Sequence, residues 1–130
     1  MKKLTREWVR KAEADYRLAA KLASEDESFH DQLCFHCQQS AEKYLKALLQ
    51  ELGLSIPRTH LLRDLVDLLV PHHADLNSLR RGVKFLTRFA VETRYPGESA
   101  NKRQAEAAFR WAKRVRHAAR QLLGIGSQKE

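Results

Sequence analysis

Two cysteines and a histidine lie close together in the segment "CFHCQQSAEKYLKALL", residues 34–49, a combination that could bind zinc or supply a nucleophile. At about 100° per residue around a helix, Cys34 and Cys37 fall on the apolar face, whereas His36 falls on the opposite side. A single zinc ion could not collect all three side chains from one regular helix, and burial disfavours the reactive thiolate. We therefore expect two reduced cysteines in a core, no metal site and no thiol catalysis.

A second group of polar residues falls within apolar helix faces. Gln38 lies inside the apolar arc of its helix, Asp15 lies in the apolar stripe of the first helix, and Arg94 shares the inward side of the fourth. An unpartnered buried amide costs on the order of 1 to 3 kcal/mol, and a carboxylate costs more. We therefore expect Asp15 within hydrogen-bonding reach of Arg94, Gln38 or Tyr95. The set would either fix the register of the helices or form a polar pocket that binds a ligand.

Positive charge is concentrated in the C-terminal third of the chain. Residues 80–120 contain twelve lysines and arginines against three glutamates, which exceeds the whole net charge of +8. Arg110, Lys113, Arg114 and His117 share one outward arc of the last helix. This pattern is typical either of solvated helix faces or of a surface for phosphates or an acidic partner.

The elements that position these residues are helices. The 130 residues suffice for one domain, and 43% of them are hydrophobic and 31% charged. No apolar run approaches the roughly 20 residues that cross a bilayer, and no apolar segment follows the basic start as in a signal peptide. We expect a single domain over residues 1–130, located in the cytoplasm, with a frayed tail from about residue 124.

Helical periodicity runs through nearly the whole chain, and no stretch alternates with period two. Gly53, Pro71 and the segment "YPGES" interrupt it. The predicted helices span residues 5–24, 29–52, 60–70, 75–94 and 99–123. Four long helices and one short one, joined by short connections, predict an all-α antiparallel bundle.

The helical faces also predict the core and a contact surface. The expected core contains Trp8, Tyr16, Cys37, Leu45, Leu48, Leu86, Trp111 and Val115. Phe85 and Phe89 lie on a flank of the fourth helix, away from its main apolar stripe. Apolar area of this kind is often covered by another chain, so we expect a homodimer or a higher homo-oligomer.

Four segments together resemble one known family. "WVRKAEADYRLAA" (8–20), "CFHCQQSAEKYLKALL" (34–49), "PRTH" (57–60) and "RYPGE" (94–98) are similar to motifs of the HEPN domain in its small stand-alone prokaryotic form. The resemblance extends from Trp8 to Leu123. It implies an up-and-down four-helix bundle with a short extra helix, a tendency to dimerise and an association with minimal nucleotidyltransferase proteins. Many HEPN proteins are metal-independent ribonucleases of toxin–antitoxin pairs, and others are non-catalytic nucleotide-binding or scaffold modules.

Catalytic members of that family carry an Arg followed after four to six residues by a His, usually with a polar residue directly after the Arg. In a dimer, the His would transfer protons and the Arg would stabilise the transition state. Here only Arg110 and His117 have this spacing, in "RWAKRVRH". Trp111 occupies the position of the polar residue and falls on the core face, so the catalytic pattern is interrupted.

Three functional hypotheses follow. The leading one is a non-catalytic HEPN module that binds a nucleotide or a minimal nucleotidyltransferase through Asp15, Gln38, Arg94 and Tyr95 and through the basic helices. The second is a ribonuclease toxin that uses Arg110 and His117 across a dimer, and the third is an assembly protein whose polar core only sets register. The sequence contains neither a P-loop nor a glycine-rich phosphate cradle, so it specifies no nucleotide, and we expect no cofactor.

Overall fold

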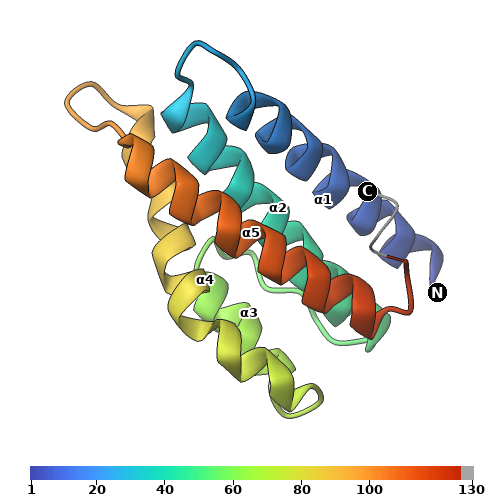
Figure 1. Ribbon diagram of the computed structural model, residues 1–130. Helices are drawn as coiled ribbons and strands as arrows, with labels where there is room; N and C mark the ends of the chain where they lie inside the picture. Colours follow the sequence, from blue (N-terminus) through green and yellow to red (C-terminus); the bar gives the residue numbers. More distant parts are fainter. Residues whose placement is uncertain (127–130) are drawn as a thin grey trace.

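The computed structural model describes residues 1–126, apart from the side chain of Arg94, and this part of the chain is all-helical without a strand. The predicted frayed tail therefore falls partly on residues 127–130, outside the described residues. Three long helices run side by side (Figure 1), namely α1 (Lys3–Ala23), α2 (His30–Glu51) and α5 (Lys102–Leu122). The predicted antiparallel bundle is confirmed.

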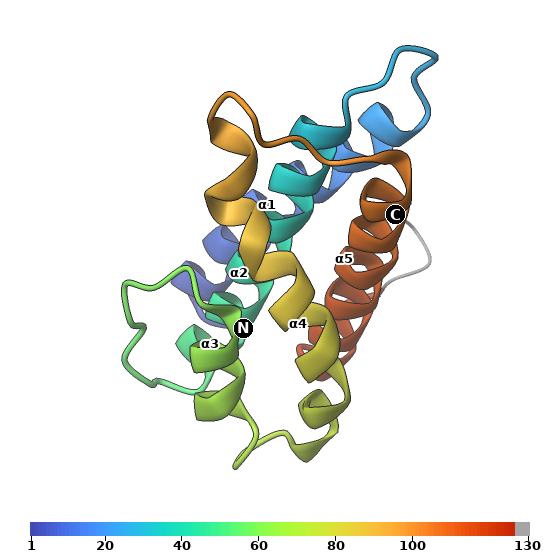
Figure 2. The same cartoon turned by 90° about the vertical axis from the view of Figure 1, so that its left-hand side faces the viewer.

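The remaining elements cover one side of α2 and α5. They are the short helix α3 (Leu62–Leu69), the 3₁₀ helix η1 (Ala74–Leu79), α4 (Arg80–Thr87) and two 3₁₀ turns, η2 (Arg88–Ala90) and η3 (Glu92–Arg94). Figure 2 shows α4 between α3 and α5, with α1 and α2 behind them. The backbone N–H of Leu62 donates to the Thr87 hydroxyl at 3.2 Å, which ties the start of α3 to the end of α4.

The predicted continuous helix over residues 75–94 is wrong. Only Arg80–Thr87 is α-helical, and 3₁₀ segments precede and follow it. The chain has to leave the helical region before Pro96, since a residue before proline disfavours that conformation, and Tyr95 is indeed extended. In a 3₁₀ helix, residues three apart lie on the same side, which brings Phe89 into line with Leu86.

This change of geometry also corrects the expectation for the two phenylalanines. Phe89 is only 2% exposed and belongs to the core, while Phe85 is half-buried and packs edge-on against it at 5.3 Å. The guanidinium of Arg88 lies over both rings. Phe85 and Phe89 therefore do not form the exposed apolar area that a second chain would cover.

The core lies where α2 packs between α1, α5 and the α3–α4 layer, and most of its predicted members are buried. Trp111 is half-buried and packs against the core. Trp8 is a correction, because its ring lies beside Lys46, 5.7 Å from the ammonium nitrogen, and outside the core cluster. Cys34 and Cys37 are free and completely buried, as expected, and burial raises the pKa of the Cys34 thiol to about 12.

Capping interactions at their ends orient α5 and α2. Asn101 and Gln104 form a reciprocal capping box at the start of α5. Just before it, the Ala100 N–H donates to the carboxylate of Asp31 at 2.6 Å, which holds the start of α5 beside the start of α2. At the other end of α2, Gly53 adopts a φ of 74°, a conformation that glycine reaches without steric cost.

None of the helices among residues 1–126 is both long enough and apolar enough to span a membrane.

Candidate functional site

Asp15 pairs with two residues of α2. One carboxylate oxygen lies 2.8 Å from Nδ1 of His36 and the other lies 2.6 Å from Nζ of Lys43. The expected contact with Gln38, Arg94 or Tyr95 is therefore wrong for Gln38 and for Tyr95, which is 61% exposed in the loop before α5. The side chain of Arg94 lies outside the described residues. Asp15 faces the flank of α2 that carries His36 and Lys43, whereas Gln38 faces the α2–α3 connection.

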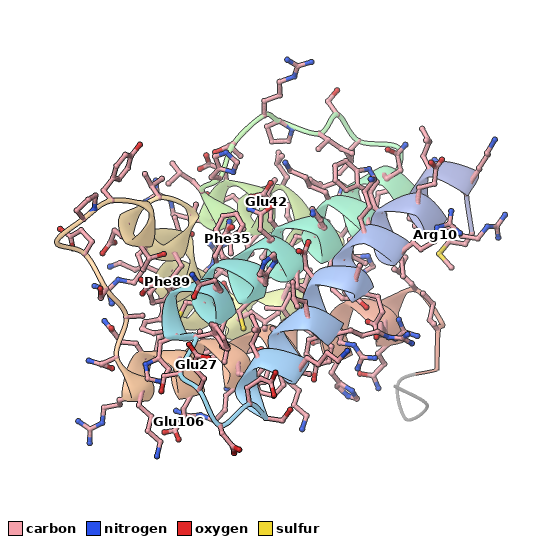
Figure 3. The ribbon with its side chains drawn as sticks, turned by 90° about the horizontal axis from the view of Figure 1, so that it is seen from above. Arg10, Glu27, Phe35, Glu42, Phe89 and Glu106 are labelled. Carbon is pink, nitrogen blue, oxygen red and sulfur yellow. The ribbon has the colours of Figure 1, made fainter. Side chains whose placement is uncertain are left out.

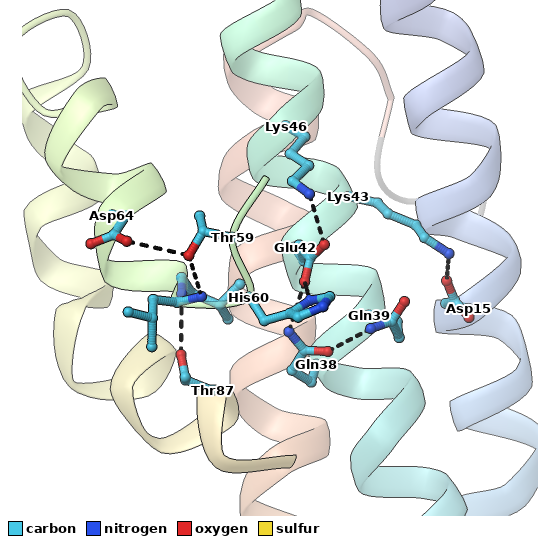
Figure 4. A network of polar contacts seen from close by, with 12 residues as sticks. Asp15, Gln38, Gln39, Glu42, Lys43, Lys46, Thr59, His60, Asp64 and Thr87 are labelled. Atoms are coloured by element: carbon cyan, nitrogen blue, oxygen red, sulfur yellow. Dashed lines mark hydrogen bonds and ion pairs between the residues drawn. The ribbon is translucent and has the colours of Figure 1, made fainter. Parts of the chain in front are cut away.

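Gln38 belongs to a separate polar cluster around Glu42 (Figure 4). The Gln38 amide is completely buried and donates to Glu42 at 3.0 Å, while its oxygen accepts from Gln39 at 2.8 Å. Glu42 also accepts from Lys46 at 2.8 Å and lies 3.0 Å from Nδ1 of His60. The cluster therefore attaches the α2–α3 connection to α2, and its polar atoms satisfy one another.

The Glu42 carboxyl makes stability sensitive to acid. Burial alone would raise its pKa, but the hydrogen bonds from Lys46, His60 and Gln38 outweigh burial and hold the pKa below 4.5. A lowered pKa means that this contribution to stability is present above the unfolded value and is lost as the pH falls through the folded value.

We therefore expect the free energy of unfolding to decline below about pH 4.5, and Glu42→Gln to flatten that decline while lowering stability at neutral pH. Urea denaturation from about pH 7 to about pH 3 measures both effects. Glu25→Gln, in the exposed α1–α2 loop, is the control. An unchanged pH dependence in Glu42→Gln would show that the cluster does not hold the carboxylate ionised.

A third polar cluster, which the sequence analysis missed, joins α1, α2 and α5. Glu13 receives a bidentate pair of hydrogen bonds from Arg116 at 2.8 and 2.9 Å, and the Tyr44 hydroxyl donates to the same carboxylate. Arg120 donates to the Tyr44 oxygen at 3.2 Å and to the Gly126 carbonyl. Burial would raise the pKa of the Glu13 carboxyl, but these hydrogen bonds and the two positive charges lower it.

The signal for this cluster was present in the sequence. Arg116 and Arg120 are four residues apart and share the α5 face of Ala112 and Ala119, so they point into the bundle and not into solvent. These two buried arginines therefore need a buried counterion, unlike the exposed basic residues of the same helix. Glu13, beside Ala12 on α1, supplies it.

Arg110, Lys113, Arg114 and His117, which the sequence places on one outward arc of α5, are all exposed. Three of them line a hollow of about 460 Å³ between η1 and α5, which we call the α5 hollow; its lining consists of Ser78, Leu79, Lys113, Arg114, Arg116, His117 and Ala118. Among residues 1–126, no carboxylate pairs with Lys113, Arg114 or His117. The α5 hollow is therefore a positively charged concave surface.

Arg110 lies elsewhere. It lines a different hollow of about 670 Å³ between the α1–α2 loop and the start of α5, together with acidic residues of that loop. Glu27 of the loop and Glu106 of α5, both in its lining, lie at the same end of the molecule (Figure 3). The structure therefore places Arg110 and His117 in two separate hollows of one chain, in surroundings of different charge.

Trp111 connects α5 to α4. A Cβ atom added at Gly82 would lie 2.0 Å from a carbon of the Trp111 six-membered ring, so the ring packs directly on the α4 backbone. The guanidinium carbon of Arg114 lies 4.5 Å from the centre of the indole. The residue after Arg110 is thus a packing residue that also positions Arg114. Among residues 1–126, no three His, Cys, Asp or Glu side chains are grouped as ligands of one metal ion.

The protein is a small all-α domain, a helical bundle with a short extra helix and a basic last helix. The chain belongs to the HEPN domain family, since the family model matches residues 5–122. The structure is also similar to the crystal structure of an archaeal HEPN homologue, with a TM-score of 0.69, 27% sequence identity, and coverage of 94% of this chain and 98% of that chain. No curated protein matches the sequence.

Proposed function

We propose that this chain is a non-catalytic HEPN module that binds a phosphate-bearing ligand, a nucleotide or RNA, in the α5 hollow. The observation that carries this proposal is the convergence of Lys113, Arg114 and His117 on one concave surface without a carboxylate partner among residues 1–126. Clustered positive charge in a hollow concentrates anionic ligands, and phosphates are the commonest such ligands. Membership of the HEPN family is consistent with this role.

The polar residues of α1 and α2 are better explained by a structural role. Asp15, Gln38 and Glu42 direct their polar atoms at neighbouring side chains, which favours a network that fixes the packing of α1 and of the α2–α3 connection on α2. The proposed ligand site is therefore on α5. Tyr95 is exposed in the adjoining loop, and the side chain of Arg94 lies outside the described residues.

The arrangement of α5 favours binding over cleavage. Arg110 and His117 line separate hollows, and Trp111 fills the position where a polar residue is expected. The alternative function, a metal-independent ribonuclease toxin, would require Arg110 and His117 of two chains to converge on one phosphate.

We expect the purified protein to bind single-stranded RNA at low salt, to lose affinity steeply as salt rises, and to leave the RNA intact. His117→Ala should retain most of the binding, because Lys113 and Arg114 still supply positive charge to the hollow. Anisotropy titrations and gel analysis of the same RNA measure both properties. Robust cleavage that persists with a chelator and disappears in His117→Ala would favour the ribonuclease instead.

We also propose a homodimer, and a minimal nucleotidyltransferase as a protein partner. The exposed apolar side chains that support self-association are Leu61 and Leu68 beside and within α3 and Leu4 and Leu18 on α1, each at least 40% exposed. Sedimentation at tens of micromolar should show a dimer, and a monomer at that concentration would contradict the proposed homodimer.

Co-elution of this protein with a minimal nucleotidyltransferase encoded by a neighbouring gene tests the proposed protein partner.

A further inference from the structure

Arg114 is an exposed basic residue of the α5 hollow that also contacts an aromatic ring. Its guanidinium carbon lies 4.5 Å from the centre of the Trp111 ring, and the residue lines the hollow. The Trp111 ring is itself fixed, because it packs directly on the α4 backbone at Gly82. The ring occupies the space that a side chain on residue 82 would need. The exposed guanidinium of Arg114 therefore adds a planar, positively charged group to the hollow, beside Lys113 and His117.

We propose that the outer face of the Arg114 guanidinium stacks on a nucleobase, so that the ligand of the α5 hollow is an unpaired nucleotide within single-stranded RNA. This inference rests on the proposed function and specifies its ligand. A guanidinium is planar and weakly hydrated, and it stacks on aromatic rings, which a lysine ammonium does not do. Lys113 and His117 then lie beside the base, where they contact the phosphates of the same strand.

The geometry selects single strands over other polyanions. Bases in a duplex are stacked on one another and offer no free face to a protein side chain, whereas unpaired bases do. A bare polyphosphate has charge but no ring, so it would use Lys113 and His117 and gain nothing from the plane of Arg114. A hollow of about 460 Å³ lies within the usual range of about 300 to 1,000 Å³ for a small-molecule site, which accommodates one nucleotide.

Charge-conserving substitutions test the inference. Arg114→Lys retains the positive charge and removes the planar group, and Arg103→Lys, at an exposed arginine of α5 outside the lining of the hollow, is the matched control. We expect Arg114→Lys to weaken binding of a labelled single-stranded RNA of about ten nucleotides by about fivefold or more, because one stacking contact contributes at least about that factor in typical sites. The affinity of Arg114→Lys for inorganic polyphosphate should be unchanged, and Arg103→Lys should bind both probes as the wild type does.

Three probes distinguish the possible outcomes, namely the single strand, a duplex of the same sequence and inorganic polyphosphate. Tighter wild-type binding of the single strand, lost in Arg114→Lys alone, supports the inference. Equal wild-type affinity for all three probes, or an unaltered Arg114→Lys, overturns it while leaving phosphate binding by the hollow intact. Absence of wild-type binding to every probe overturns both this inference and the proposed function.

Discussion

Replacing Glu13 by alanine is expected to lower the free energy of unfolding by about 3 to 5 kcal/mol, the usual cost of removing one partner of a buried ion pair. The side chains of Arg116 and Arg120 are each only 7% exposed, and that of Glu13 is 12% exposed. The substitution removes the bidentate partner of Arg116 and the acceptor of the Tyr44 hydroxyl at once. Two buried positive charges would lose this counterion, and neither can deprotonate to compensate.

The matched control uses the same carboxylate. Arg17 also pairs with Glu13, at 3.5 Å, but its side chain is 72% exposed, so Arg17→Ala should change stability by no more than about 0.5 kcal/mol. Chemical denaturation of both variants at neutral pH measures the difference. Equal and small effects of the two substitutions would show that the cluster of α1, α2 and α5 does not hold the bundle together.

The second large effect is expected on ligand binding. Reversing two charges in Lys113→Glu/Arg114→Glu should weaken binding of single-stranded RNA at low salt by about 100-fold, since two attractive contacts become repulsive. Because each phosphate contact to a single strand contributes about 0.7 to the slope of log affinity against log salt, the slope should fall by about 1.4. Anisotropy titrations at several salt concentrations give both numbers.

A variant with the same change of net charge separates a site from a general field. Arg6 and Arg10 are exposed on α1, and Arg10 points outward from the bundle (Figure 3). Arg6→Glu/Arg10→Glu should therefore weaken RNA binding only a few-fold, through the long-range potential. Equal losses in the two double variants would contradict a site on α5 and indicate binding to the positive protein as a whole.

Most of the fold could be predicted from the sequence because each long helix carries an apolar stripe of its own. The spacing of Ala12, Tyr16 and Ala19 identifies α1, and the apolar face of α2 includes both cysteines. The type of helix over residues 75–94 could not be predicted in the same way. The buried residues Leu76 and Leu79 are three residues apart, as are Leu86 and Phe89, and a spacing of three fits both a 3₁₀ helix and an α-helix.

The polar contacts were harder to predict than the helices. A helical wheel shows that Asp15 faces inward, but its partner depends on how α1 is rotated against α2, and that rotation brings it to His36 and Lys43 instead of Gln38. Glu13 and Arg116 are 103 residues apart, so no local pattern links them. Exposure of the α5 arc was predictable, because it follows from the periodicity of one helix alone.

Mapping amide chemical shifts during titration with single-stranded RNA tests the central claim most directly. If the α5 hollow binds RNA, the largest and saturable changes in chemical shift should lie at residues 78–79 and 111–118. The chemical shifts of the other residues should stay unchanged, and the RNA should be intact at the end of the titration. Changes concentrated instead around Asp15, Gln38 and Glu42 would contradict the account, and would return the ligand site to the polar residues of α1 and α2.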